Sequence, residues 1–474
     1  MSPLLLVAVP LVLAGLVSRR SATLLLVLAG LVDAALAITF AAVHIDISAL
    51  GAPWVTTDAT ARLFLMLIDV IFLGIAGYVW NRVRTTPEIE HDIARIGRLA
   101  LVFLAAANAV VIANHMLVMW IALELTTFAA APMIIRAGVP SSRKASWSYF
   151  LFSMVGLALA WLGFQCLGRS IEASGATPTF FLDQMPRVVG GEADLWRKLG
   201  LALCFLGFGT KMGLAPMYSW LPETYDEAPP AVTALLAAVQ FNCALVGLLR
   251  VLEVYRAANP ELVSQQLVVI GLASMVVSAV SIIATRNLKR LIAYASINHA
   301  GVIAIGLGIG KTASYGLLLY VVSNAFIKAI LFLTAGKIKA HYGTKDTREI
   351  RGLIQDLPYS GLFLMVGTFA LLGFPPFGSF LGELLILSGL VRSGQTLVFV
   401  AFCAIITMTF VATGRTVFPM IWGEPRRKVS WPAQTLAGAA PKLVFLIALV
   451  AMGIYMPPTV NALFRRVAGA LGGE

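Results

Sequence analysis

The sequence alternates between apolar runs of about 20 residues and short polar segments along its whole length. A run of this length is what one α-helix needs to cross the hydrocarbon layer of a bilayer. The pattern predicts an all-α, polytopic membrane protein with about 14 transmembrane helices. The predicted spans are residues 3–18, 22–43, 60–80, 98–113, 115–135, 147–168, 199–219, 231–252, 266–285, 291–309, 313–336, 360–391, 396–420 and 442–464.

The seventh span carries a lysine and a proline inside its apolar run. Lys211 lies near the middle of the span, where a charged side chain costs about 2.5–3.5 kcal/mol by insertion scales. Pro216 removes a backbone hydrogen bond and crowds the preceding turn, so the helix is predicted to break near Ala215. Such a break is tolerated at membrane depth only around a protein-lined or hydrated cavity, which favours an ion site. The alternative is a lysine that snorkels from the end of a span.

The twelfth span repeats this arrangement. Pro375 and Pro376 lie between Gly373 and Gly378, and Glu383 follows in a renewed apolar run. The whole run of about 32 residues is longer than one crossing needs, which also indicates a break. Because an odd- and an even-numbered span run in opposite directions, two interrupted helices five spans apart are typical of an inverted repeat.

This pattern predicts four segments. Residues 1–97 form an N-terminal three-span segment, and residues 98–252 form the first inverted repeat, spans 4–8. Residues 266–420 form the second repeat, spans 9–13, and residues 421–474 hold the last span and the tail. Each repeat contains one broken helix.

Ionisable residues at membrane depth are the candidate functional groups. Besides Lys211, they are Glu124, His299, Lys328 and Glu383. Their order along the chain suits a proton relay, in which making and breaking a Glu124–Lys211 ion pair switches the lysine between holding and releasing a proton. Structural roles remain open for four of them: an ion-pair partner (Glu124), a packing or partner-facing charge (Lys328), a hydrogen-bonded core histidine (His299) and a subunit-contact charge (Glu383).

Five further acids are interpreted differently. Asp33 and Asp69 fall inside apolar spans, and a structural or lateral-contact role is favoured for both. Glu223, Asp226 and Glu227 lie at a helix end and are predicted to form a solvated cytoplasmic face.

Composition and charge agree with a membrane protein. The chain is 59% hydrophobic and 12% charged, against about 45–50% and 25% in soluble domains. The net charge of +12 comes from lysines and arginines in short loops, the pattern that sets topology, so nucleic-acid binding is excluded. Loops on one face hold about 20 of them and loops on the other about 10, which predicts that the richer face is cytoplasmic and both termini lie on the opposite side. The membrane is expected to be a bacterial inner membrane, with the termini periplasmic.

Cysteines and histidines show no ligand spacing. The cysteines lie singly in apolar spans: Cys166, Cys204, Cys243 and Cys403. The histidines are scattered: His44, His91, His115, His299 and His341. Disulfide, zinc, iron–sulfur and haem sites are therefore not expected, and neither a metal nor a cofactor is predicted on this chain.

Four stretches carry a family resemblance: GTKMGLAPMYSWLPETYDEAPPAVTALL, NLKRLIAYASINHAGVI, AFIKAILFLTAG and GFPPFGSFLGELLIL. Over residues 60–420 the chain resembles the antiporter-like, proton-translocating subunits of respiratory complex I, multi-subunit cation/proton antiporters and energy-converting hydrogenases. Within this family it looks most similar to the membrane subunit of formate-hydrogenlyase-type (hydrogenase-4-like) complexes.

The resemblance implies roles for the buried groups. It implies that Glu124 pairs with Lys211, that His299 and Lys328 are central relay groups, and that Glu383 is the terminal group. The chain departs from the family pattern at three positions: Asn242 stands where relatives usually have lysine, and Tyr320 and Asn324 replace expected histidines.

Three functions remain open at this stage. The leading hypothesis is a proton-translocating subunit of a multi-subunit membrane complex, driven by chemistry on partner chains. The first alternative is the proton-path subunit of an inorganic-carbon or cation uptake complex with a soluble or zinc-bearing partner. The second is a membrane scaffold that does not conduct, an alternative raised by Tyr320 and Asn324.

Overall fold

A computed structural model describes residues 2–42, 53–85, 90–173, 175–185, 195–256, 260–424 and 436–472. These residues are almost entirely helical; in this part of the chain β-pairing occurs only as isolated bridges. The predicted all-α class is therefore confirmed.

The helices follow the predicted apolar runs closely. In chain order they are α1 (Leu5–Gly15), α2 (Ala22–Ala42), α3 (Ala59–Thr85), α4 (Glu90–Ile112), α5 (Met116–Ile134), α6 (Pro140–Ala173), α7 (Leu195–Met212), α8 (Trp220–Glu227), α9 (Pro230–Ala234), η3 (Leu235–Gln240), α10 (Phe241–Arg256), α11 (Pro260–Ala284), α12 (Leu288–Ile309), η4 (Gly310–Thr312), α13 (Ser314–Tyr342), α14 (Leu353–Asp356), α15 (Pro358–Leu371), α16 (Gly378–Arg392), α17 (Thr396–Trp422), α18 (Leu436–Ile454) and α19 (Pro458–Gly472).

Ten helical stretches among the described residues are long and apolar enough to cross a membrane, or eleven if the bent pair α18–α19 is one span. The chain is thus a multi-pass membrane protein. The other predicted spans correspond to α1, α7 and the interrupted pair α15–α16.

The last predicted span, 442–464, is not one straight helix. It bends by 73° where α18 ends and α19 begins. Pro457 and Pro458 stand at the bend, and proline cannot continue a helix through the preceding residue.

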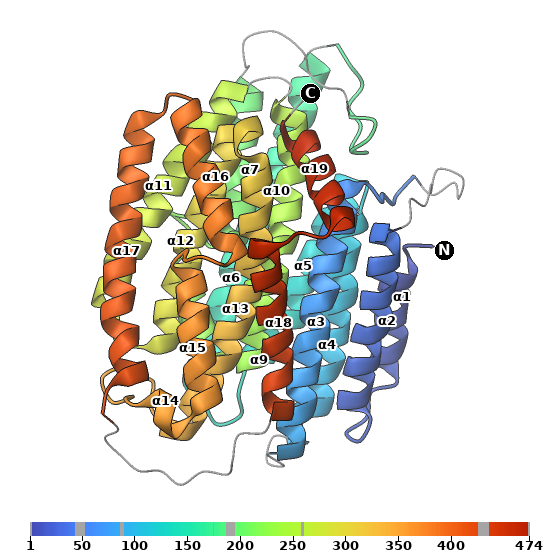
Figure 1. Cartoon of the computed structure of the whole chain (residues 1–474). Coiled ribbons are helices and arrows are strands. Elements are labelled where there is room, and N and C mark those ends of the chain that lie inside the picture. Colours follow the sequence, from blue (N-terminus) through green and yellow to red (C-terminus); the bar gives the residue numbers. More distant parts are fainter. Residues whose placement is uncertain are drawn as a thin grey trace.

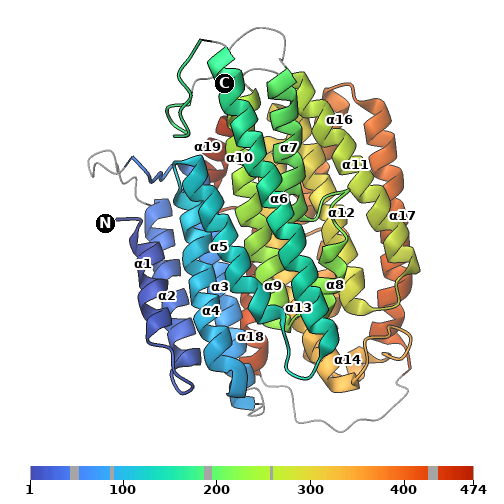
Figure 2. The ribbon, with the colours of Figure 1, turned by 180° about the vertical axis from the view of Figure 1, so that it is seen from behind.

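The spans form one bundle with a buried centre. Figures 1 and 2 show α10 and α13 in the middle, α1 and α2 at one edge and α17 at the opposite edge. The most apolar 18 residues of spans 230–255 and 314–342 are all buried, whereas only 22% of the corresponding stretch of α17 is buried. Helix α14 lies at the lower end of Figure 1 and α19 towards the upper end.

Glycines let α6 and α7 approach closely, as small residues do at membrane helix interfaces. A Cβ atom on Gly207 would lie 2.6 Å from the backbone oxygen of Gly156 and 2.6 Å from the backbone nitrogen of Ala160. Gly209, two residues further along α7, has room for a Cβ, since its nearest neighbour is a Leu214 side-chain atom at 3.5 Å. The approach of α6 positions the end of α7, where Lys211 stands.

We therefore expect Gly207→Ala to lower the unfolding free energy by about 1–3 kcal/mol, because the added methyl group meets backbone that cannot move aside. The matched control, Gly209→Ala, should be neutral or slightly stabilising, since alanine favours helix by about 1 kcal/mol over glycine. Thermal unfolding of the purified variants measures both. Equal melting temperatures for the two variants would contradict this packing.

Candidate functional site

The seventh span is interrupted, as predicted. Helix α7 ends just before Gly213, whose φ of +77° favours glycine, and the Ala215–Pro216 peptide bond is cis. Freed backbone groups find side-chain partners: the Trp220 indole donates to the carbonyl oxygen of Thr210 at 2.9 Å, and the Ala215 N–H donates to the Ser274 hydroxyl at 2.9 Å. The break is thus closed by α8 on one side and α11 on the other.

The twelfth span breaks in the same way. Gly373 has a φ of +69°, and the Pro375–Pro376 peptide bond is cis. The Ser379 hydroxyl donates to the carbonyl oxygen of Ala370 at 2.7 Å. Both predicted breaks therefore share one arrangement. A glycine with positive φ lies three residues before a cis-proline. A side chain donates to the carbonyl oxygen of the residue three positions before that glycine.

Lys211 is buried beside the first break. Its ammonium group donates a hydrogen bond to the Thr127 hydroxyl and lies 5.4 Å from the centre of the Tyr149 ring. Glu124 is also buried and interacts electrostatically with Lys211. Neither oxygen of its carboxylate has a hydrogen-bond partner among the described residues. In this structure Thr127, rather than Glu124, is the direct partner of the lysine.

Gln240 connects this cluster to the centre of the bundle. Its amide donates to the Tyr149 hydroxyl at 2.6 Å and to the Thr126 hydroxyl at 3.2 Å. Gln240 ends η3, a π-helical segment of the kind often found at functional sites. The next residue, Phe241, presents its ring 3.9 Å from the ammonium nitrogen of Lys328.

The second half of the site lies around α12, α13 and α16. His299 Nδ1 is hydrogen-bonded to the Tyr320 hydroxyl, and Lys328 acts electrostatically on the same histidine. Tyr320 in turn interacts with the charge of Glu383. The Glu383 carboxylate packs against Gly373 at the second break, where a Cβ would meet its Oε2 at 2.6 Å.

Some residues of this site carry no distinct signal in the sequence. Thr127, Tyr149 and Gln240 are uncharged polar residues in apolar spans, as many structural residues are. Asn242, which stands in place of an expected lysine, donates to the Ala238 carbonyl of the preceding segment η3 at 2.6 Å. Asn324 is buried, and its side-chain oxygen has no hydrogen-bond partner in the described part of the chain.

Two buried acids lie outside this cluster. Asp69 accepts a hydrogen bond from Asn108 at 3.1 Å, and Asp33 interacts electrostatically with Asp69. Lys442, which the sequence did not single out, is buried over the Phe363 ring at 4.7 Å. None of these contacts reaches the Lys211 or Lys328 clusters through a hydrogen bond among the described residues.

The prediction that Asp226 and Glu227 form a solvated face is wrong. Arg136 pairs with Glu227 at 2.7 Å, and Lys345 pairs with Glu227 at 2.9 Å and with Asp226 at 2.8 Å. Arg290 adds a further ion pair to Asp226 at 3.2 Å. We call these five residues the ion-pair clamp; it ties α8 to α12, to the segment between α5 and α6, and to the segment after α13.

Ion pairing within the clamp lowers the pKa of Glu227. Burial by itself would raise the pKa of Glu227, but hydrogen bonds from Lys345 and Ser141 and the charge of Arg136 outweigh burial and lower the pKa to about 2. Glu223, the third acid predicted to be solvated, lies 3.7 Å from an exposed Lys144.

Among the described residues, no group of three His, Cys, Asp or Glu side chains is placed to hold a metal. His44 lies outside the described part of the chain, and so does the side chain of His91.

Two broken spans and a buried set of lysines, acids and a histidine define a multi-pass helical membrane protein of the ion-translocating type. The chain belongs to the NADH:quinone oxidoreductase/Mrp antiporter transmembrane family, whose model matches residues 113–409. This membership confirms the resemblance found in the sequence.

Relatives of known name span most of the chain. It is 30% identical to the hydrogenase-4 component F homolog of Methylacidiphilum infernorum, covering 86% of this chain and 87% of that protein. It is 24% identical to a Na(+)/H(+) antiporter subunit of Bacillus subtilis, covering 84% of this chain and 79% of that protein.

Solved structures share the fold. The chain superposes on a subunit of the Mrp complex from a Dietzia species with a TM-score of 0.86 at 20% identity, covering 99% of this chain and 97% of that one. A subunit of respiratory complex I from Thermus thermophilus gives a TM-score of 0.80 at 24% identity over the full length of both chains.

We expect Glu227→Gln to lower the unfolding free energy by about 1–3 kcal/mol at pH 7, because it removes the carboxylate that pairs with Arg136 and leaves Lys345 with Asp226 alone. Since the folded-state pKa is about 2, below the usual 4.5, this stabilisation is present above pH 4.5 and disappears as pH falls towards 2. The difference in melting temperature between Glu227→Gln and the unsubstituted protein should therefore be smaller at pH 3 than at pH 7.

Glu223→Gln is the control, because its pair with exposed Lys144 is expected to contribute little. A difference for Glu227→Gln that stays constant between the two pH values would contradict the ion-pair explanation.

Proposed function

We propose that this chain is the proton-translocating membrane subunit of a multi-subunit complex, driven by chemistry on partner chains. Protons move through Glu124, Lys211, Lys328, His299 and Glu383, with no cofactor on this chain. One observation carries the proposal: these groups lie in two clusters inside the bundle, Lys211 with Glu124, and Lys328 with His299 and Glu383. The neighbouring residues Gln240 and Phe241 each contact one cluster and so bring the two close together. The names of the relatives, a hydrogenase component and a cation/proton antiporter subunit, support the same class.

The contacts suggest how a proton passes along the series. Thr127, Tyr149 and Tyr320 carry hydroxyls that both donate and accept, so each can bridge ionisable neighbours. Gln240 holds the Tyr149 hydroxyl in place, and the Phe241 ring offers Lys328 a cation–π contact in place of a counter-ion. Lys328 lacks a hydrogen-bond partner among the described residues, which leaves its ammonium group free to respond to charge nearby.

The two breaks support the inverted repeat, spans 4–8 against spans 9–13 in a protein of fourteen spans. Leu214 N–H donates to the carbonyl of Gly209 at 2.8 Å, and Phe374 N–H donates to that of Phe369 at 3.0 Å, the same five-residue step. Residues 98–252 and 266–420 are the proposed repeats, flanked by segments 1–97 and 421–474. Matched hydrogen bonds at both breaks are what an internal repeat requires.

The distribution of charge supports the orientation. Basic residues before α14 and around the ion-pair clamp lie at the lower end of Figure 1, and the less basic end holds α19. The more basic end is expected to be cytoplasmic, which places both termini on the periplasmic side of a bacterial inner membrane.

We expect Lys211→Ala to reduce proton translocation about 100-fold or more in the complex reconstituted into vesicles, because it removes the titratable group beside the first break. Lys311→Ala, at an exposed position between α12 and α13, is the control and should keep normal flux. Assembly of both variants is checked by size-exclusion chromatography with the partner subunits. Normal proton flux through an assembled Lys211→Ala complex would refute the proposal.

Tyr320→Phe separates a conducting subunit from a passive scaffold. Loss of the hydroxyl breaks the contact with His299, and flux is expected to fall about fivefold, as for one hydrogen bond worth about 1 kcal/mol. The packing of the ring is kept, so the melting temperature should change little. A melting shift without any change in flux favours the scaffold alternative.

A further inference from the structure

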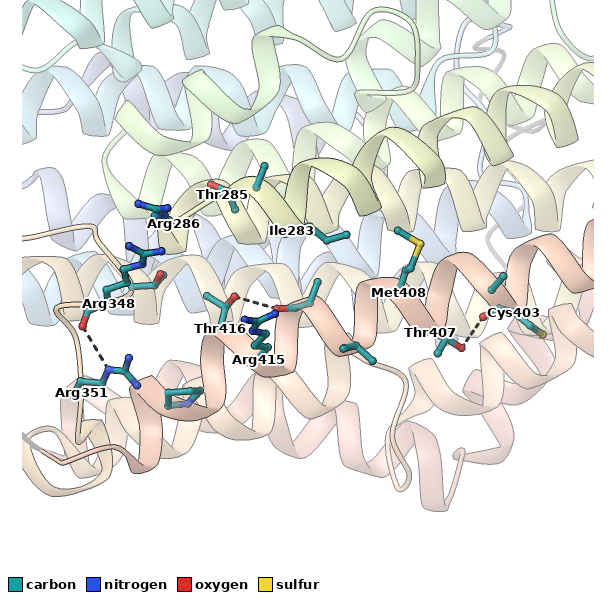
Figure 3. Close-up of a pocket in the computed structure, with 16 residues that line it drawn as sticks. Ile283, Thr285, Arg286, Arg348, Arg351, Cys403, Thr407, Met408, Arg415 and Thr416 are labelled. Carbon is teal, nitrogen blue, oxygen red and sulfur yellow. Dashed lines mark hydrogen bonds between the residues drawn. The ribbon is translucent and has the colours of Figure 1, made fainter.

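A wide groove runs between α11 and α17 at the edge of the bundle. It encloses about 1130 Å³, more than the roughly 300–1,000 Å³ of most small-molecule pockets. Figure 3 shows its two unlike ends: arginines gather at one, and Met408 and Cys403 lie towards the other. The buried relay residues do not line it.

The polar end holds four arginines: Arg286, Arg348, Arg351 and Arg415. No acidic side chain lines the groove, and among the described residues no carboxylate forms an ion pair with any of the four. A side-chain hydrogen bond within this group runs from Arg351 Nε to the Arg348 carbonyl oxygen at 3.5 Å. Four like charges gathered without a counter-ion favour an anion, and arginine suits phosphate because its guanidinium can donate two parallel hydrogen bonds.

The rest of the groove is apolar. Ile283 of α11 and Val411 of α17 are each 58% exposed in this chain and face the groove with Met408. From Arg415 to Cys403, α17 rises about 18 Å, at 1.5 Å per residue. Half of a hydrocarbon core of about 30 Å is about 15 Å, so the apolar wall matches the length of one lipid leaflet.

We propose that this groove binds one anionic phospholipid. Its phosphate lies among the four arginines, and its acyl chains lie along the apolar wall formed by α11 and α17. The arginines stand near α14, at the end of the bundle that carries most of the basic loops, where the headgroups of one leaflet lie (Figure 1). Basic pockets between transmembrane helices are suited to such headgroups. A free phosphate ion would leave the apolar wall uncovered, and an uncharged lipid would leave the arginines unpaired.

The test uses the full chain with its partner subunits, purified in detergent and stripped of lipid. Phosphatidylglycerol, phosphatidylcholine with the same acyl chains, and glycerol 3-phosphate are titrated separately, and binding is followed by native mass spectrometry and by melting temperature. Of the three compounds, we expect only phosphatidylglycerol to bind tightly. The double variant Arg286→Gln/Arg415→Gln should weaken it about 25-fold, or about fivefold for each arginine removed.

Arg392→Gln is the control, because Arg392 ends α16 away from the groove and its loss should change nothing. If the double variant fails to assemble, Val411→Trp replaces it: this exposed position tolerates a large side chain that fills the path of the acyl chain. Lost phosphatidylglycerol binding in that variant supports the proposal. The proposal is overturned if either variant binds phosphatidylglycerol as the unsubstituted protein does, or if glycerol 3-phosphate stabilises the protein equally well. It is also overturned if the double variant loses a partner subunit but keeps its lipid.

Discussion

Backbone groups freed by a break in a transmembrane helix must find partners inside the protein, because lipid offers none. Trp220 and Ser274 supply these partners at the first break, and Ser379 supplies one at the second. The same contacts bring α8, α11 and α16 against the breaks. Because Lys211 stands two residues before Gly213, closing the first break also fixes the position of its ammonium group.

The ionisable groups of the proposed proton path are not arranged as tight ion pairs. Lys211 contacts a hydroxyl, and Lys328 contacts an aromatic ring. Glu124 and Glu383 act on their neighbours through space. A tight buried pair is strongly stabilised in one charge state and is costly to break, whereas loosely coupled groups respond to small changes in their surroundings. This arrangement suits the proposed exchange of protons better than it suits fixed structural pairing.

Charges near the basic end of the bundle behave in two ways. In the ion-pair clamp, Asp226 and Glu227 are matched by cations from three separate parts of the chain, so the clamp is structural. In the groove between α11 and α17, the arginines have no acidic partner among the described residues. Most members of both sets look alike in the sequence, as basic residues in or beside short loops, and Arg415 inside α17 is the exception. Among the described residues only the clamp has its counter-charges.

The sequence by itself determined the helical membrane class, the two interrupted spans and the buried charges, because apolar run length, proline and charge at depth act locally. Only the tertiary structure decided which groups meet. Thr127 came to face Lys211, and Tyr320 came to face His299, in place of the expected histidine pattern. Asp226 and Glu227 became buried, and the last span bent at its tandem prolines. Contacts between residues 20 to 120 positions apart depend on how helices pack, and no local pattern of apolar and polar residues encodes that packing.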